Sequence, residues 1–484
     1  MTRHLILLLL LIFFSDLTAT AQGSMSQAVR AFALDEDLAG AVVAIDVVDV
    51  STGQRLAAHQ PDLALIPAST QKLITTAIAM DVLGADHTFR TRLLSSGTLE
   101  KGVLSGDIII EGGGDPSLAS PYLEGVPRLP ELLDRWVDKI RRAGITEVRG
   151  RIIADDAYFG TDGSAPGWPW ADLGNYYGAG AYGLNVHENF YFLDLLQRSR
   201  VGDRPAVQRL RPSVPGLSLS NELRSGPRGS GDQAYIYGAP YGYDNYVRGT
   251  IPVGTGTFTI KGAIPDPPLF LAQLLREALA AEGVAVRLPA VTTRQLGADD
   301  RPSVKVLDEH HSPKLSSLVD RTNLRSNNLY AEALLRAVNK ERGRELALLA
   351  SPEYYLEWLE ERGLPTKGLQ FEDGSGLATR NFFSPEFMTA FLRSQAGKSR
   401  WRQSIPLAGK TGSMRSYLKG TVADGRLWAK SGSLGAVRAY AGYIRSAKGR
   451  ELAFCIMVNN HTMEGRPLRN KMLALMKELC QLAP

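Results

Sequence analysis

The chain has 484 residues, 44% hydrophobic and 22% charged, as is usual for a globular protein with a large core. Its 55 basic and 50 acidic side chains leave a net charge of +5, which excludes a strongly basic nucleic-acid-binding protein and an acidic disordered chain. Two cysteines exclude a disulfide scaffold, and the seven histidines form no HExxH motif. We therefore expect no metal, no cofactor and no nucleic-acid partner.

The first residues follow the order of a secretory signal peptide. A short basic segment, 1–4, precedes ten apolar residues, 5–14, and an A-x-A cleavage signature ends at Ala21. Ten apolar residues are too few to span a bilayer, which needs about 20, and no later run reaches that length. The alternative is a buried N-terminal helix. The sequence predicts a signal peptide over residues 1–21, no integral membrane anchor, and a soluble protein in the periplasm.

Residues 22–87 indicate the first part of an α/β domain. β-branched residues at 41–50, a turn, and residues 55–59 predict two strands. Apolar residues at helical spacing predict a helix that begins at Ala68 and ends before Gly84. Ser69 therefore lies at the opening of a long, mostly apolar helix.

Residues 88–305 have a different pattern, in which short apolar runs are broken by glycine and proline. This pattern predicts an inserted, mostly β module of two subdomains. The expected strands are 107–111, 151–154 and 249–253, and the expected helices are 130–143 and 268–281. Gly112-Gly113-Gly114 is interpreted as a turn, because no phosphate-binding motif accompanies it.

Aromatic residues gather in the loops of this insertion. They are Trp168, Trp170, Tyr176, Tyr177, Tyr182, Tyr235, Tyr237, Tyr241, Tyr243 and Tyr246. Rings of this kind mostly fill a core, and this interpretation is favoured. A saccharide-stacking surface is the alternative.

Residues 306–484 predict the second part of the α/β domain. Helices are expected at 314–324, 328–338, 352–362 and 385–394, and then come strands at 426–433, 436–445 and 451–459 and a final helix at 466–482. Cys455 lies in the last strand and Cys480 in the last helix, so the two either form a disulfide or remain buried thiols.

Ser69 and Lys72 form an S-x-x-K motif. Residues three apart share one face of a helix, so the lysine amine can reach the serine hydroxyl and activate it as a nucleophile. Ser416 and Lys419 also match, but they lie in a glycine-flanked turn region and are discarded.

Ser326-Asn327-Asn328 is an S-x-N triplet between two predicted helices. Ser326 can relay a proton, and Asn328 can bind a substrate amide. Helix capping is the alternative, because serine and asparagine are favoured at helix starts.

Two segments match K-[TS]-G, a motif whose lysine and hydroxyl bind a substrate carboxylate and whose backbone offers an oxyanion donor. Lys410-Thr411-Gly412 fits the letters best, but it lies in a loop of glycine and serine. Lys430-Ser431-Gly432 lies within a predicted strand that two more strands and a helix follow. The sequence therefore predicts Lys430 as the functional lysine.

The order S-x-x-K, S-x-N, K-S-G resembles the penicillin-recognising serine acyltransferases. The long insertion between the first two motifs narrows the resemblance to the D-alanyl-D-alanine carboxypeptidases and endopeptidases of peptidase family S13. Further similar segments are GGGDPSL at 112–118, residues 168–189, SNNLYAEALL at 326–335, DGSGL at 373–377, and the pair GKTGSMR and AKSGSL. Asn327 and Ser431 depart from the usual aspartate and threonine.

The resemblance implies an α/β, penicillin-binding-protein transpeptidase-like domain, a β-sheet with helices on both faces, built from 22–87 and 306–484. It implies a serine D-Ala-D-Ala carboxypeptidase, and an endopeptidase, acting on peptidoglycan stem peptides and acylated by β-lactam antibiotics. The implied roles are nucleophile for Ser69, base for Lys72, proton relay for Ser326, and substrate binding for Asn328, Lys430, Ser431, Gly432 and Ser433. A serine β-lactamase or esterase, and a non-catalytic peptidoglycan-binding protein, are the alternatives.

Overall fold

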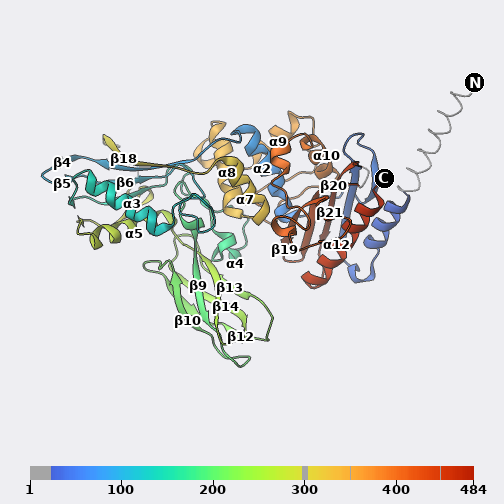
Figure 1. Ribbon diagram of the computed structural model, residues 1–484, viewed down its shortest axis with the longest axis horizontal. Coiled ribbons are helices and arrows are strands. Elements are labelled where there is room, and N and C mark those ends of the chain that lie inside the picture. The colour runs from blue at the N-terminus through green and yellow to red at the C-terminus, as the bar shows by residue number, and fades with distance from the viewer. Residues whose placement is uncertain (1–22, 297–302, 349, 447–448, 484) are drawn as a thin grey trace, which may run out of the picture. The chain divides into compact units, whose positions relative to one another are not determined.

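The computed structural model describes residues 23–296, 303–348, 350–446 and 449–483 (Figure 1). The predicted signal peptide at 1–21 lies outside these residues. The chain folds into two compact units: the first runs to Asp81 and also contains Val319–Asn327 and the residues from Pro352 onward, and the second contains Val82–Leu318 and Asn328–Ser351. Within the described residues we find no helix with the length and apolarity that a membrane crossing requires.

An antiparallel five-stranded sheet forms the centre of the first unit, in the order β19-β20-β21-β1-β2. The pairing of β1 with β21 joins the two ends of the chain. All five strands begin and end within one residue of the predicted positions. They are β1 (Val42–Asp49), β2 (Arg55–His59), β19 (Leu427–Leu434), β20 (Val437–Arg445) and β21 (Glu451–Asn459).

Helices cover both faces of this sheet. On one face, Thr389 of α10 (Pro385–Gln395) donates a hydrogen bond to Asp46 of β1 at 2.5 Å. On the other, Met472 of α12 (Gly465–Leu482) packs in one core with Ile45, the residue before Asp46. Because successive side chains of a strand point to opposite faces, the two helices lie on opposite sides. This confirms the predicted α/β fold class.

The predicted helix from Ala68 begins as a single 3₁₀ turn, η2 (Ala68–Gln71), and continues as α2 (Lys72–Val82). Other helices that contribute residues to the first unit are a helix over the described residues 23–33, η1 (Glu36–Leu38), α7 (Leu315–Arg325), α9 (Glu353–Glu360), α11 (Ser399–Arg402) and η6 (Gly412–Met414).

The described residues of the second unit form four sheets, in the orders β17-β8-β6-β3-β18, β16-β7-β5-β4, β10-β9-β15 and β11-β14-β12, with β13 paired to β14. The β10-β9-β15 sheet is antiparallel, and the other three contain both parallel and antiparallel pairs. The strands of the first two are β3 (Arg90–Ser96), β4 (Thr98–Glu100), β5 (Val103–Ser105), β6 (Ile108–Glu111), β7 (Glu147–Val148), β8 (Ile152–Asp155), β16 (Ala285–Val286), β17 (Val291–Thr292) and β18 (Val304–His311). Those of the last two are β9 (Phe190–Leu196), β10 (Ala206–Arg211), β11 (Ser218–Asn221), β12 (Arg224–Gly226), β13 (Gln233–Tyr237), β14 (Asp244–Pro252) and β15 (Thr257–Ala263).

The helices of the second unit include both those predicted for the insertion. α3 (Leu129–Arg142) and α5 (Pro267–Ala281) bury Trp136 and Phe270 in one core with Ile108 and Ile152. The others are α4 (Trp170–Leu173), η3 (Tyr176–Gly178), η4 (His187–Asn189), α6 (Thr293–Leu296), α8 (Asn328–Glu341) and η5 (Leu346–Leu348).

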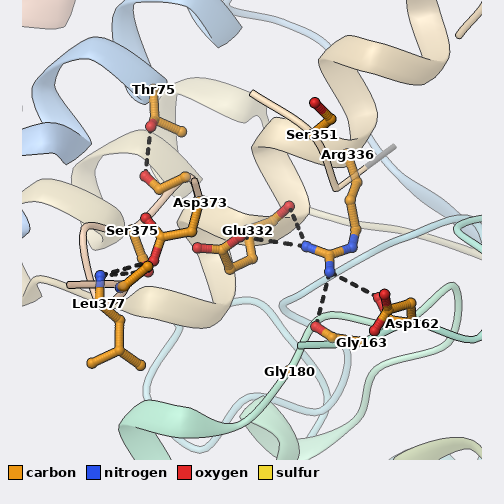
Figure 2. A network of polar contacts seen from close by, with 12 residues as sticks. Thr75, Asp162, Gly163, Gly180, Glu332, Arg336, Ser351, Asp373, Ser375 and Leu377 are labelled. Atoms are coloured by element: carbon orange, nitrogen blue, oxygen red, sulfur yellow. Dashed lines mark hydrogen bonds and ion pairs between the residues drawn. The ribbon is translucent and has the colours of Figure 1, made fainter. Parts of the chain in front are cut away.

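α8 is fixed in the second unit by a buried arginine. The guanidinium of Arg336 pairs with Glu332 at 3.4 Å and donates to the carbonyl oxygens of Asp162 and Gly163, each at 2.9 Å (Figure 2). The unit bounds therefore differ from the predicted divisions after 87 and 305, and the assignment of α8 and β18 to functional domains stays a prediction.

The two cysteines are free and buried. Cys480 belongs to the core between α12 and the sheet, which also takes in Phe454 and Ile456 of β21. Cys455 lies between these two residues, so its side chain points to the opposite face of the sheet. Of the two alternatives, buried thiols are correct and the disulfide is wrong.

Candidate active site

Ser69 and Lys72 lie at the junction of η2 and α2. The Nζ atom of Lys72 is 2.9 Å from the Oγ atom of Ser69, and the lysine side chain is fully buried. Ala68, directly before the serine, has a φ of 47°, a left-handed conformation that is uncommon for residues other than glycine. The turn therefore holds the hydroxyl and the amine together.

A loop centred on Asp373 fixes Lys72 from its other side. The carbonyl oxygen of Ser375 is 2.6 Å from Lys72 Nζ. The Asp373 carboxylate shapes this loop, because it accepts hydrogen bonds from the backbone N–H groups of Gly376 (2.7 Å), Leu377 (2.9 Å) and Ala378 (2.7 Å) (Figure 2). The conformation of this loop therefore determines where the Ser375 carbonyl oxygen contacts the amine of Lys72.

Two further bonds hold the same loop against the helix that carries the lysine. Thr75 Oγ1 donates to the carbonyl oxygen of Gly374 at 2.5 Å, and Gln71 Nε2 donates to the carbonyl oxygen of Asp373. Gly376 has a φ of 78°, and a Cβ atom there would lie 2.0 Å from the carbonyl oxygen of Ala68. The loop and the Ser69 turn are therefore packed too closely for any residue but glycine.

We expect Asp373→Ala to destabilise the protein and to slow acylation of Ser69. The substitution removes a carboxylate that accepts from three backbone N–H groups, which costs about 3 kcal/mol or more of the free energy of unfolding. Urea unfolding and the rate of covalent labelling by a penicillin measure the two effects. Asp373→Asn keeps one acceptor oxygen, so its free energy of unfolding and its labelling rate should fall less than those of Asp373→Ala. Equal labelling rates in wild type and both variants would contradict the positioning role of Asp373.

Ser326 lies between α7 and α8 with a φ of 55°. Its Oγ atom is 2.8 Å from Nζ of Lys430, which lies in the middle of β19. A strained serine that meets a buried lysine is what a proton relay needs, and simple capping of a helix does not require the lysine. The structure thus brings Ser326 and Lys430 together, and the proton-relay role of Ser326 stays a prediction.

Lys430 is fully buried, and its Nζ atom also lies 2.8 Å from the carbonyl oxygen of Ser431. Burial, and secondarily the charge of Lys72, hold the pKa of Lys430 well below its ordinary value. Ser326 Oγ and the Ser431 carbonyl oxygen are thus equally close to the amine. Ser431 is partly exposed and Ser433 is exposed. Carboxylate binding by Lys430 and Ser431 stays a prediction.

The lowered pKa of Lys430 makes stability depend on pH. Between the folded pKa and the ordinary lysine pKa of 10.5, the unfolded chain binds a proton that the folded chain does not, so stability rises with pH in this window. Urea unfolding at about pH 7 and about pH 9 should show this rise, with a slope of up to about 1.4 kcal/mol per pH unit from this one group. Lys430→Met should flatten it, and an unchanged slope would show that Lys430 keeps its proton.

Gly432 lets β19 lie against the Ser69 turn. A Cβ atom at this position would be 2.6 Å from the carbonyl oxygen of Pro67 and 3.1 Å from the amide nitrogen of Ser69. The backbone of β19 therefore runs directly beside the candidate nucleophile. An oxyanion hole made of the N–H groups of Ser69 and Ser433 stays a prediction.

Asn328 follows Ser326 by two residues, and its predicted binding of a substrate amide stays a prediction. Asn328 opens α8 in the second unit, where its Nδ2 atom donates to the carbonyl oxygen of Tyr177 at 2.7 Å. The rival Lys410 forms an ion pair with Asp424 at 3.1 Å, with 54% of its side chain exposed. The segment that matches the K-T-G consensus at all three positions therefore has its lysine in an exposed ion pair.

A separate cavity of about 570 Å³ lies in the second unit, between residues that include Phe89, Arg90, Glu111, Tyr158 and Lys340. It shares no residue with the predicted site. Its wall mixes charges of both signs, so it does not indicate one ligand class.

Sequence reasoning missed the Asp373 loop as part of the site. In the sequence, the D-G-S-G segment at 373–376 indicates only a resemblance to the family. An aspartate followed by two glycines within three residues predicts a turn capped by the carboxylate. The sequence pattern does not predict which lysine this turn will contact.

Two curated carboxypeptidases are similar to this chain over most of its length. The chain is 29% identical over 469 residues to a D-alanyl-D-alanine carboxypeptidase of Actinomadura sp. (strain R39), covering 93% of this chain and 83% of that protein. It is 22% identical over 434 residues to the D-alanyl-D-alanine carboxypeptidase DacB of Haemophilus influenzae, covering 87% and 86%.

Among solved structures, the fold is similar to that of penicillin binding protein 4 (dacB) from Haemophilus influenzae. The TM-score is 0.78 at 21% identity, over 93% of this chain and 99% of that one. A second structure of that protein, in complex with a β-lactam, has a TM-score of 0.72 at 20% identity, over 94% and 98%. Residues 25–479 match the model of the D-Ala-D-Ala carboxypeptidase 3 (S13) family, and the chain belongs to that family.

Proposed function

We propose that this protein is a serine D-Ala-D-Ala carboxypeptidase and endopeptidase that acts on peptidoglycan stem peptides and cross-links through an acyl-enzyme. The observation that carries the proposal is the pairing of Ser69 with Lys72 at 2.9 Å and of Ser326 with Lys430 at 2.8 Å, in one unit and beside the backbone of β19. The predicted signal peptide supports action in the periplasm.

In the proposed acylation step, Ser69 Oγ attacks the carbonyl carbon of the penultimate D-Ala residue while Lys72 accepts the hydroxyl proton. The N–H groups of Ser69 and Ser433 bind the oxyanion. Ser326 passes a proton to the leaving amine, and its contact with Lys430 orients the hydroxyl for that transfer. The carbon–nitrogen bond breaks, D-Ala leaves, and water then hydrolyses the ester. No cofactor takes part.

β-Lactam antibiotics are proposed as covalent inhibitors, because the strained lactam offers the same serine an amide carbonyl. The related penicillin binding protein 4 has been solved with a β-lactam, which supports the proposal. A serine β-lactamase would instead release the antibiotic quickly, and a non-catalytic peptidoglycan-binding protein would form no adduct.

Mass spectrometry after incubation with a penicillin and with purified muropeptides tests the proposal. We expect a long-lived adduct on the peptide that contains Ser69, loss of D-Ala from pentapeptides, and cleavage of cross-linked dimers. Loss of D-Ala without dimer cleavage would limit the activity to carboxypeptidase. Rapid release of hydrolysed penicillin would favour a β-lactamase, and the absence of both adduct and product would contradict the enzyme assignment.

A further inference from the structure

An aromatic cluster lies on one face of the sheet that contains β13 and β14, in the second unit. Tyr237 and Tyr246 are paired across these strands, and their rings stack at a centroid distance of 5.0 Å and an angle of 11°. Trp170 of α4 packs against both, at 5.1 Å and 6.2 Å, and Tyr235 lies 6.4 Å from Tyr237. We call these four residues the aromatic platform.

The platform is open to solvent. Trp170 is 55% exposed and Tyr235 is 43% exposed. The Trp170 ring is tilted against the two tyrosine rings, by 42° and 53°, and more than half of its surface stays exposed. The chain has six tryptophans, and the other five are less exposed: Trp136, Trp168, Trp358 and Trp401 are buried, and Trp428 is partly buried.

The fold of the sheet does not require these rings. Ile236 and Val247, which alternate with the platform tyrosines, point to the opposite face and are fully buried in the core of the unit. Core packing is thus supplied by the inner face. The favoured expectation that the aromatics fill a core holds for Trp168 and Tyr182, which are buried, and is wrong for Trp170 and Tyr235.

The surroundings of the platform are polar and carry no net charge. The guanidinium of Arg248 lies 4.5 Å from the centre of the Tyr246 ring and forms an ion pair with Glu222 at 2.6 Å. Ser220 of β11 is paired with Tyr246 and is exposed. The neighbouring positions on the same face are Ser218, Arg224, Gln233, Asp244 and Thr250, and the charges of Arg224 and Asp244 are opposite. No aliphatic side chain lies among these described positions.

We propose that the aromatic platform binds the glycan strand of peptidoglycan, a chain of uncharged N-acetylated hexoses. The apolar C–H face of a pyranose ring fits the open side of Trp170, and its hydroxyl and N-acetyl groups find donors and acceptors at Ser220, Arg248 and Glu222. A cancelled local charge suits a neutral polymer better than an anionic lipid surface.

This inference rests on the proposed function, because the stem peptides of the substrate are attached to that glycan. Binding itself is separate from catalysis, since the platform lies in the second unit and uses no residue of the candidate active site. It can therefore be measured with a sugar that contains no peptide.

The test uses the full mature chain and a hexamer of β-1,4-linked N-acetylglucosamine. Calorimetry gives the affinity, and iodide quenching of tryptophan fluorescence reports whether the sugar shields Trp170. We expect wild type to bind with shielding, Trp170→Ala to bind about tenfold more weakly, and Trp170→Phe to lie between them. Tyr122→Ala is the matched control, because this ring is 39% exposed but lies outside the platform, and it should bind as wild type.

Activity measurements separate this inference from the proposed function. Trp170→Ala should release D-Ala from a free pentapeptide at the wild-type rate but show a raised KM for glycan-linked peptides. Hexamer binding that is absent, or unchanged in Trp170→Ala, would overturn the inference. So would shielding of Trp170 by phosphatidylglycerol vesicles but not by the sugar, which would make the platform a membrane-contact surface. Sugar binding without any D-Ala release would contradict only the proposed function.

Discussion

Ser69→Ala is expected to abolish covalent labelling by penicillin and to lower D-Ala release by about four orders of magnitude or more. The substitution removes the oxygen that is 2.9 Å from Lys72 Nζ, and with it the atom that forms the acyl bond. Alanine fits the η2 turn without adding atoms, so the free energy of unfolding should change little. Labelling followed by mass spectrometry, with circular dichroism to confirm the fold, measures both effects.

Ser416→Ala is the matched control, because Ser416 and Lys419 repeat the S-x-x-K letters. Ser416 and Lys419 are both exposed, whereas Lys72 is buried against Ser69. The control should label as wild type. Labelling that survives in Ser69→Ala and disappears in Ser416→Ala would move the nucleophile to the second motif.

Lys430→Ala is expected to lower D-Ala release by about two to three orders of magnitude, and Lys410→Ala to change it less than about twofold. Removing Lys430 takes the amine from Ser326 Oγ and leaves the relay hydroxyl without its partner at 2.8 Å. Removing Lys410 breaks an exposed ion pair with Asp424, a kind of interaction worth about 0–1 kcal/mol. Steady-state kinetics with a pentapeptide compare the two variants.

Lys430→Met tests whether the lost side-chain volume alone explains the lower rate of D-Ala release, because methionine fills much of the same buried volume without the amine. We expect it to unfold at a urea concentration close to that of wild type and to remain as inactive as Lys430→Ala. If Lys410→Ala is the inactive variant, the functional K-[TS]-G is the one in the loop.

The sequence predicts the strands of the first unit well, because β1, β20 and β21 are dense in β-branched and apolar residues between clear turn signals. Because nearly every position in these strands is apolar, the sequence does not show which face of the sheet each side chain occupies. Cys455 follows Phe454 and precedes Ile456, all three are buried, and only the structure shows that it points away from Cys480. A disulfide therefore could not be excluded from the letters.

Motif order predicted the pairing of Ser69 with Lys72, because a spacing of three residues fixes a helical face. It predicted Lys430 over Lys410 because strand context carries more information than one side-chain letter. It did not predict the role of Asp373, since hydrogen bonds from one carboxylate to a distant loop and that loop's contact with Lys72 depend on tertiary packing. The exposure of Trp170 could not be predicted from the sequence either, because aromatic residues in this segment occur at both buried and exposed positions.

The pairing of β1 with β21 has a consequence for the order of folding. Val42 is aligned with Asn459, so more than four hundred residues must be synthesised before this ladder can close. Long-range strand pairing of this kind is slow, because the entropy of closing the loop opposes it until the contacts form. Most of the second unit is one continuous stretch, Val82–Leu318, and can fold while the rest of the chain is still being synthesised. The turn that carries Ser69, encoded near the start, is thus among the last parts to be completed, and no partly synthesised chain carries an assembled candidate site.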